Sequence, residues 1–263
     1  MRYAQYPPSP ALAPIVEWYW FLEGPDCAEP QPIVPDGRAE IVLHFGDRFE
    51  RHHPDGRVER QDPALLVGQI LSPIRLACRG RAGVAAIRLR PAAARALIGC
   101  AAAELTERTI DLEAVAGSTG RVRERLALAR DDRARIRILE AWLAPRVRVE
   151  PSRAVAAAVE AILAAPAAAS LPRVALHAGI SVRQLERRFL ADVGMAPKTF
   201  ARIARLQTAL ARIADGTSLA DAAHACGYYD QPHMTRDFAR LADTSPAAWS
   251  ASGADLTRLF VAG

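Results

Sequence analysis

Two different spacings of apolar residues divide the chain near Pro151. Before this point, short runs alternate apolar and polar positions, for example in residues 40–45, and this period of two is typical of half-buried strands. Pro-Asp-Gly triplets at residues 35–37 and 54–56 predict turns between runs, in which Asp bonds its own backbone and Gly takes a positive φ. The spacing predicts strands over residues 15–22, 40–45, 65–70, 74–78 and 84–90.

After Pro151 the apolar spacing becomes that of helices, and the composition becomes rich in alanine. Three helices are also expected before this point, over residues 92–100, 121–130 and 133–143. The predicted fold class is therefore α+β with two domains. Residues 1–148 are expected to form a β-barrel or sandwich with accessory helices, and residues 149–263 an all-α domain.

An internal repeat lies within the all-α part. At an offset of 48 residues, three positions recur: Leu171, Ala175 and Gly179 match Leu219, Ala223 and Gly227. At an offset of 49, Ser181 corresponds to Asp230 and Arg187 to Arg236. Repeats of this length indicate duplicated supersecondary units.

Each repeat unit has the sequence pattern of a helix-turn-helix. A small residue lets two helices cross closely, the glycine permits a tight turn, and Ser181 or Asp230 caps the second helix. Ser181 and Gln184 also fit a capping box. A helix over residues 199–215 is expected to join the units. Five apolar residues are expected on the buried faces of the two second helices: Val182, Leu185 and Phe189, then Met234 and Phe238.

The outward faces of these second helices carry side chains that suit base edges in a major groove. Arginine can bind guanine with two hydrogen bonds, and glutamine suits adenine. Asp237 is expected at the flank of the second outward face, and Arg202 and Arg240 are candidates for phosphate contact. Eight residues are predicted to contact DNA: Arg183, Gln184, Arg187 and Arg188 in the first unit, and Gln231, His233, Thr235 and Arg236 in the second.

Bulk charge adds little to this prediction. The chain has 34 Lys and Arg residues against 29 Asp and Glu, which gives a net charge of +5 and argues against an acidic binding protein. All of these cations except Lys198 are arginine, whose guanidinium forks onto phosphate or guanine. The placement of the arginines, rather than their number, indicates DNA binding.

Residues 170–250 resemble the DNA-binding domain of the AraC/XylS family of transcription regulators. Met234, Asp243 and Trp249 depart from the family pattern, and Asp243 stands where a glycine is usual. The resemblance implies two helix-turn-helix units, over about residues 171–190 and 219–239, that contact adjacent major-groove segments. Eight residues of the second unit carry the match: Ala223, Gly227, Tyr228, Arg236, Phe238, Arg240, Ser245 and Pro246.

Residues 1–115, which include VPDGRAEIVLHFGD, resemble a cupin-like N-terminal domain found in such regulators. The resemblance implies a sensor or dimerisation domain. Its candidate effector-binding residues are Arg38, Glu40 and His44. His52 and His53 are expected in a hairpin loop, and because no HxH motif with a suitably spaced Glu is present, we predict neither a metal site nor a cofactor.

The sequence therefore predicts a sequence-specific transcription regulator that binds double-stranded DNA and is not an enzyme. RNA polymerase, a small-molecule effector and a second copy of the chain are further candidate partners. Four scattered cysteines and the lack of a membrane-spanning segment predict a cytoplasmic location. Two alternatives stay open: a cupin-like metal-dependent enzyme with a helical appendage, and a helical module that binds protein partners.

Overall fold

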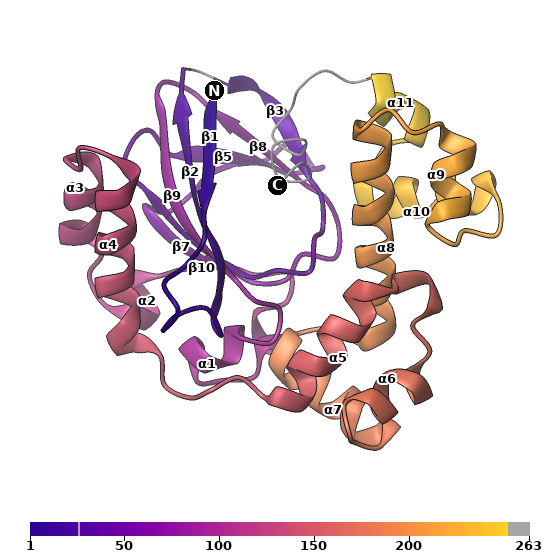
Figure 1. Ribbon diagram of the computed structural model, residues 1–263. Coiled ribbons are helices and arrows are strands. Elements are labelled where there is room, and N and C mark those ends of the chain that lie inside the picture. Colours follow the sequence, from indigo (N-terminus) through magenta and orange to yellow (C-terminus); the bar gives the residue numbers. More distant parts are fainter. Residues whose placement is uncertain (26, 252–263) are drawn as a thin grey trace.

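The computed structural model describes residues 1–25 and 27–251, which form a β-rich part followed by a helical part (Figure 1). One antiparallel sheet has six strands in the order β1 (Arg2–Tyr6), β2 (Val16–Gly24), β9 (Ala82–Leu89), β4 (Glu40–His44), β7 (Ala64–Val67) and β10 (Thr109–Asp111). A second antiparallel sheet has the order β3 (Cys27–Ile33), β8 (Ile74–Cys78), β5 (Phe49–His52) and β6 (Val58–Arg60). The arrangement confirms the predicted fold class.

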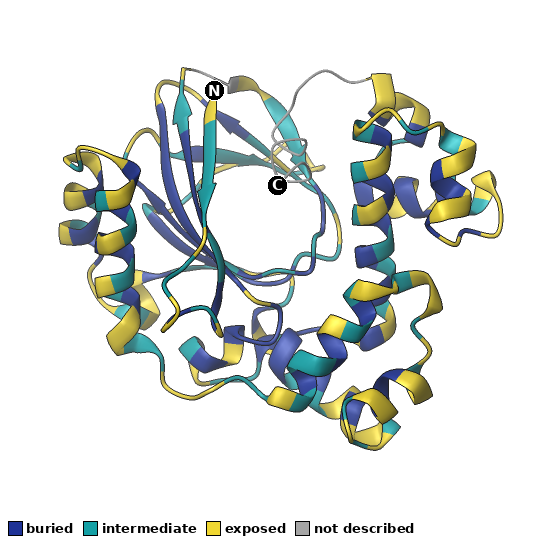
Figure 2. Cartoon of the chain, viewed as in Figure 1, coloured by how far each residue is buried: buried dark blue, intermediate teal, exposed yellow. Residues whose placement is uncertain are grey.

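The six-stranded sheet buries both of its faces, because successive side chains of a strand point to opposite sides. In β4, Ile41 and Leu43 join a core cluster with Phe21 on the face that the helices cover. Val42 joins a separate cluster with Trp20 on the face toward the second sheet. The strands of this sheet are accordingly drawn as largely buried in Figure 2.

The apolar pattern predicts inner strands but misses all four edge strands, β1, β10, β3 and β6, together with β5. Strand β6 is exposed at every position, so that its side chains show no buried face. Strand β3 contains Pro30 and Pro32, which are tolerated at a sheet edge because the missing N–H is not needed there. Strand β5 has three polar residues among its four.

Short helices follow the strands and cover the outer face of the six-stranded sheet. The predicted helices 92–100, 121–130 and 133–143 are present with slightly different ends. Leu126, Leu139 and Leu143 are fully buried against the sheet. These helices are α1 (Ala94–Ile98), η1 (Ala102–Leu105), α2 (Glu113–Ala116), α3 (Gly120–Ala127), α4 (Asp132–Leu143) and η2 (Ala144–Arg146).

The helical part is built around the long helix α8. Its core cluster also includes Val34 and Ala92 of the β-rich part, so the two parts share one continuous core. The predicted all-α domain ends with residues 252–263, which lie outside the described residues. The helices are α5 (Arg153–Ala164), η3 (Pro166–Ala168), α6 (Leu171–His177), α7 (Val182–Val193), α8 (Pro197–Ala214), α9 (Leu219–Ala225), α10 (Gln231–Ala242) and α11 (Pro246–Ala251).

None of the helices described in residues 1–25 and 27–251 is long and apolar enough to cross a bilayer.

Candidate nucleic-acid interface and ligand cavity

Two helix-turn-helix units, α6–α7 and α9–α10, lie on either side of α8 in the sequence. Their turns contain Gly179 and Gly227, with φ of 68° and 67°. At the start of α7, the Ser181 hydroxyl accepts a hydrogen bond from a backbone N–H, and Asp230 does the same at the start of α10. Both predicted turns and both predicted caps are therefore present.

Helix α7 directs the predicted DNA-contacting residues away from its core. Arg183 and Arg187 are exposed, and Arg188 is half-buried. Gln184 is exposed as well, and its Oε1 accepts a hydrogen bond from the Ser181 N–H at 3.0 Å, as the predicted capping box requires. The opposite side of α7 is buried through Leu185, Phe189 and Val193.

Helix α10 presents a smaller polar face. Gln231 and Arg236 are exposed, whereas His233 and Thr235 are half-buried. The His233 ring stands edge-on to Tyr228, with 5.2 Å between ring centroids. The Thr235 hydroxyl donates to the Gln231 carbonyl at 3.0 Å. Gln231 and Arg236 are therefore the more accessible of the four residues predicted in this unit.

Asp237 is not at the flank of an exposed face, as the sequence suggested, but is buried at 2% exposure. Its carboxylate accepts hydrogen bonds from Arg202 Nε at 2.7 Å and from Arg205 Nη2 at 3.0 Å, both of which come from α8. The Arg205 guanidinium also lies 4.4 Å from the ring centroid of Tyr228. Arg202 thus anchors α10 to α8, and its contact with phosphate stays a prediction.

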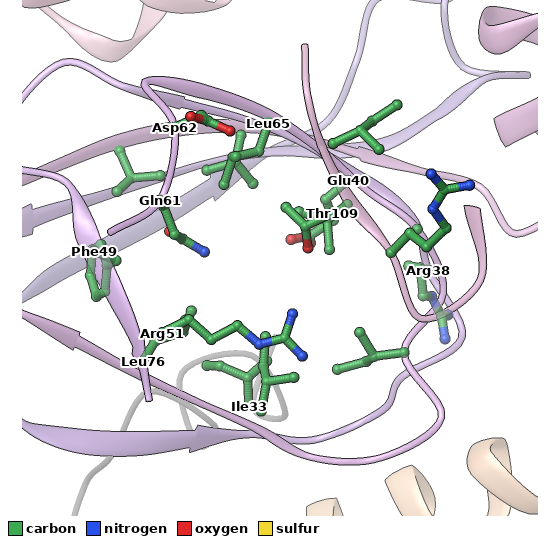
Figure 3. Close-up of a pocket in the computed structure, with 18 of the residues that line it drawn as sticks. Ile33, Arg38, Glu40, Phe49, Arg51, Gln61, Asp62, Leu65, Leu76 and Thr109 are labelled. Atoms are coloured by element: carbon green, nitrogen blue, oxygen red, sulfur yellow. The ribbon is translucent and has the colours of Figure 1, made fainter. Parts of the chain in front are cut away.

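A cavity of about 510 Å³ lies between the two sheets of the β-rich part (Figure 3). This volume falls within the range of small-molecule sites. Its wall comes from both sheets and combines apolar side chains with a similar number of polar and charged ones. The apolar lining includes Trp20, Leu22, Ile33, Val42, Phe49, Leu65, Leu76, Val84 and Ile110.

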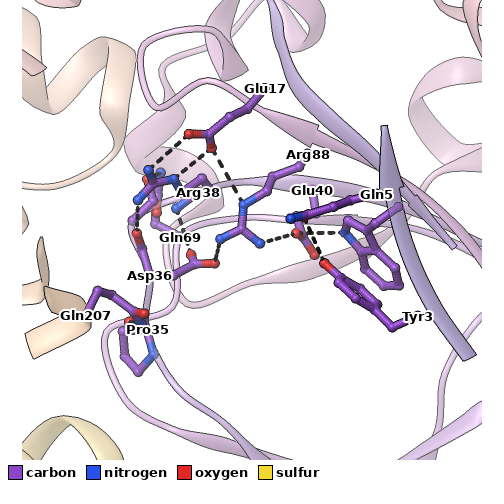
Figure 4. A network of polar contacts seen from close by, with 12 residues as sticks. Tyr3, Gln5, Glu17, Pro35, Asp36, Arg38, Glu40, Gln69, Arg88 and Gln207 are labelled. Carbon is purple, nitrogen blue, oxygen red and sulfur yellow. Dashed lines mark hydrogen bonds and ion pairs between the residues drawn. The ribbon is translucent and has the colours of Figure 1, made fainter. Parts of the chain in front are cut away.

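An ion-pair network occupies the end of the cavity nearest α8 (Figure 4). Buried Arg88 contacts the carboxylates of Asp36 and Glu40, the latter at 3.0 Å. Arg38 pairs with Glu17 at 2.8 Å. Burial opposes the Arg88 charge, but the surrounding carboxylates raise its pKa above the ordinary value. Of the candidate effector residues, Arg38 and Glu40 thus line the cavity with their charges already compensated.

His44, the third candidate, lies on the cavity wall with 1% exposure. The polar partner of the ring is the Gln61 side chain, whose hydrogen bond opposes the effect of burial on the pKa of His44. Burial lowers the pKa of His44 to about 4, so the ring is neutral at pH 7. The two histidines that were predicted in a hairpin loop have partners or places outside the His44 site. His52 is the last residue of β5, and the His53 ring contacts the Glu59 carboxylate at 3.1 Å.

Several charged cavity residues were missed by sequence reasoning, among them Arg88 and Arg51. Arg51 is half-buried on β5 and extends into the cavity (Figure 3). The alternation of Phe49 and Arg51 along β5 is the signal that places both on the inner face. Within residues 1–25 and 27–251, no three His, Cys, Asp or Glu side chains are grouped as ligands for a metal ion.

The cavity wall includes Gln207, a residue of α8. Its amide donates to the Pro35 carbonyl at 2.6 Å (Figure 4). In the same turn, Gly37 has a φ of 79° and lies against one edge of the Phe200 ring. The turn at residues 35–37 therefore connects the cavity with the helix that joins the two helix-turn-helix units.

A helix-turn-helix domain family, of the AraC type, matches residues 174–252. The chain carries the DNA-binding domain of an AraC-type transcription regulator. In the N-terminal part of this regulator, a domain of unknown function (DUF6597) matches residues 4–111, and it is consistent with the predicted cupin-like domain. Among the curated proteins, none matches this chain.

Solved structures share the whole arrangement of the regulator. ToxT from Vibrio cholerae is 8% identical, and the likeness covers 88% of this chain and 97% of ToxT with a TM-score of 0.54. ToxT from Vibrio cholerae O395 bound to (E)-4-(8-methylnaphthalen-1-yl)but-3-enoic acid is 9% identical over 92% of this chain and 99% of that one, with a TM-score of 0.52. Identities this low show the common fold alone.

An AraC-type DNA-binding domain-containing regulator from Chromobacterium violaceum is 26% identical over 37% of this chain and 89% of that chain, with a TM-score of 0.36.

Proposed function

We propose that the regulator reads two adjacent major-groove segments of double-stranded DNA with α7 and α10, and that it acts by binding rather than as an enzyme. The observation that carries this proposal is the repetition of one design in both units. Each has a capped helix, a buried apolar side and outward polar residues such as Arg187 and Arg236. Guanidinium groups in this position suit guanine edges. RNA polymerase and a second copy of the chain stay predicted partners.

We further propose that a small molecule in the cavity controls this activity. Gln207 and Phe200 of α8 contact the turn at residues 35–37, which forms one wall of the cavity. A ligand that binds better to one position of this turn shifts the population of α8 positions. Because α8 joins the two helix-turn-helix units, its position sets the spacing of α7 and α10. A ligand that moves α8 therefore changes the affinity of the protein for DNA.

Selection of bound DNA from a random pool, followed by footprinting of the full chain, tests DNA reading. Arg187→Ala is expected to cost about 1–3 kcal/mol at one base pair and to relax specificity there. Arg130→Ala is a control with the same change of charge, because Arg130 is 82% exposed in the β-rich part. Absence of any protected sequence, or equal losses in the two variants, contradicts the proposal.

The link to the cavity is tested with Gln207→Ala in the full chain, measured as DNA affinity by fluorescence anisotropy. Removing the bond to the Pro35 carbonyl is expected to change affinity by about fivefold or more, the lower end of common coupling effects. Lys198→Ala, on the first turn of α8, is the control for altering this helix without touching residues 35–37. A Gln207→Ala affinity that equals that of the wild type refutes control through this contact.

A further inference from the structure

The turn of the second helix-turn-helix unit is one residue longer than the turn of the first, which is why the repeat offset changes from 48 to 49 residues. Backbone hydrogen bonds identify the extra residue. In the first unit, the Ile180 N–H donates to the Ala175 carbonyl at 3.0 Å. In the second unit, the Tyr228 N–H donates to the Ala223 carbonyl at the same distance. Ile180 and Tyr228 are therefore equivalent, and Tyr229 has no counterpart in the first unit.

Packing does not account for the side chain of Tyr229. The two equivalent residues face inward, because Tyr228 is 5% exposed and Ile180 packs against the same core cluster. Tyr229 is 93% exposed, the highest value among the large apolar side chains that the structure describes. Its side chain makes no hydrogen bond or ring contact with any residue in the described part of the chain. Single exposed apolar residues are common, so the position of Tyr229 decides what it can do.

This position is the end of α10 that is expected to approach DNA. Tyr229 directly precedes Asp230, which caps the helix. The second helix of a helix-turn-helix contacts base edges with the residues at its N-terminal end, and the sugar-phosphate backbone borders the groove there. Tyrosine hydroxyls are among the groups that bond to phosphate oxygens, and such contacts fix the register of a protein on the duplex.

The turn that carries Tyr229 is stabilised by His233. The Tyr229 N–H donates to His233 Nδ1 at 3.5 Å, and the His233 N–H donates to the Asp230 carboxylate at 2.7 Å. The His233 ring also stands edge-on to Tyr228, as described above. A side chain on an ordered turn loses less freedom when it binds a partner, which favours binding.

Helix α10 also has fewer accessible polar groups than α7 with which to bind DNA. His233 and Thr235 are half-buried, and the exposed Pro232 has no polar side chain. Contacts with phosphates supply a large share of the affinity of DNA-binding proteins and position the groups that read bases. A phosphate contact next to the first turn of α10 would compensate for this smaller polar face.

We propose that Tyr229 is a further DNA-contact residue, whose hydroxyl donates to a backbone phosphate beside the major-groove segment that α10 reads. This inference rests on the proposed binding of DNA by α7 and α10. A phosphate contact carries no base sequence, so Tyr229 raises the affinity for every site to the same extent. Its hydroxyl is a neutral donor, so the contact releases no counterion.

Fluorescence anisotropy of the full chain, with DNA obtained by the selection described above, tests the proposal. Tyr229→Phe is expected to weaken binding about tenfold, because a hydrogen bond to a charged group is lost. The loss should be equal for the selected site and for sites with single base changes. The slope of log affinity against log salt concentration should equal that of the wild type.

Tyr6→Phe is the matched control, because it removes a hydroxyl that bonds to Asp132 within the β-rich part. It should keep the wild-type affinity for DNA. Replacing single phosphates of the selected site by methylphosphonates then locates the contact. At one phosphate beside the segment that α10 reads, the replacement should cost the wild type several-fold more affinity than it costs Tyr229→Phe.

The proposal is overturned if Tyr229→Phe binds DNA as tightly as the wild type, if its loss depends on the base sequence, or if no phosphate shows this difference. In each of these cases the wild type still binds DNA, so the proposed function holds. A wild-type chain that binds no DNA overturns the proposed function and this inference together. Circular dichroism of each variant establishes that the fold is intact.

Discussion

Gly37 and Gly56 form a matched pair for measuring the contact between the β-rich and helical parts. Each ends a Pro-Asp-Gly turn, with φ of 79° and 85°. In both turns the Asp carboxylate accepts a hydrogen bond from the backbone N–H two residues later, at 2.9 Å. The two glycines therefore share their local backbone requirements and differ in what surrounds them.

The surroundings of the two glycines differ in their contact with Phe200. A Cβ on Gly37 would lie 2.6 Å from Cε2 of Phe200, whereas a Cβ on Gly56 would meet no atom within 4 Å. Phe200 is 1% exposed, and its ring packs edge-on against Phe189 with 5.5 Å between centroids. The ring has no free space into which to turn, so Gly37→Ala must push α8 away from the turn.

The free energy of unfolding should fall in both alanine variants, but by different amounts. The left-handed conformation costs an alanine about 1–2 kcal/mol at either position. Overpacking against a buried ring adds about 1–3 kcal/mol at Gly37 alone. We expect a loss of about 1–2 kcal/mol for Gly56→Ala and, from the sum of these two costs, about 2–5 kcal/mol for Gly37→Ala.

Urea denaturation of the full chain, followed by tryptophan fluorescence and far-UV circular dichroism, measures both losses. The difference between the variants isolates the contact with Phe200, because the change in unfolded-state entropy from Gly to Ala is common to both. Equal losses would refute the close packing of α8 on the turn. They would also remove the physical basis for control of α8 by the cavity.

Three further outcomes are expected. Asp237→Asn keeps the side-chain shape but weakens two hydrogen bonds from partly exposed arginines, so thermal denaturation should show a loss of about 1–3 kcal/mol, with Asp215→Asn as a neutral control. Asp243→Gly should stabilise the protein by about 1 kcal/mol, since Asp243 holds a φ of 50°, and a fall in stability contradicts this. Between pH 7 and pH 5, the unfolded chain protonates His44 at its ordinary pKa of 6.5 while the folded chain, with a pKa of about 4, does not, so stability drops as pH falls. His44→Gln should reduce that drop by about 2 kcal/mol in urea titrations at both pH values, and an unchanged drop refutes burial as the cause.

Local signals in the sequence explain why the helix-turn-helix units could be predicted. A cap such as Ser181, a turn glycine such as Gly179 and the apolar spacing of α7 act within a few residues, so their geometry follows from the sequence. The repeat strengthens the prediction of a helix-turn-helix, because the same signals recur around Gly227. Strand β4 was predictable for a similar reason, because successive residues of this segment alternate between two faces in a regular way.

Features that depend on distant partners could not be read in the same way. A helical projection places Asp237 at the flank of an exposed face because it contains no information about Arg202 and Arg205 of α8. Arg51 was missed because β5 is too polar and short to be predicted as a strand. Glu40 looks like a free ligand group in sequence, but Arg88, 48 residues later, compensates its charge.

The shared core has a consequence for engineering. Val34 and Ala92 belong to the same apolar cluster as the helix-turn-helix units, and Thr106 donates to the Gly194 carbonyl at 2.5 Å. Cutting the chain between the two parts would expose apolar surface on α7 and α8, which favours aggregation. A chimaera that joins these DNA-binding helices to an unrelated sensor therefore needs a replacement for the covering surface as well as a linker. The β-rich part and the DNA-binding helices of this regulator must therefore be exchanged together or redesigned at their boundary.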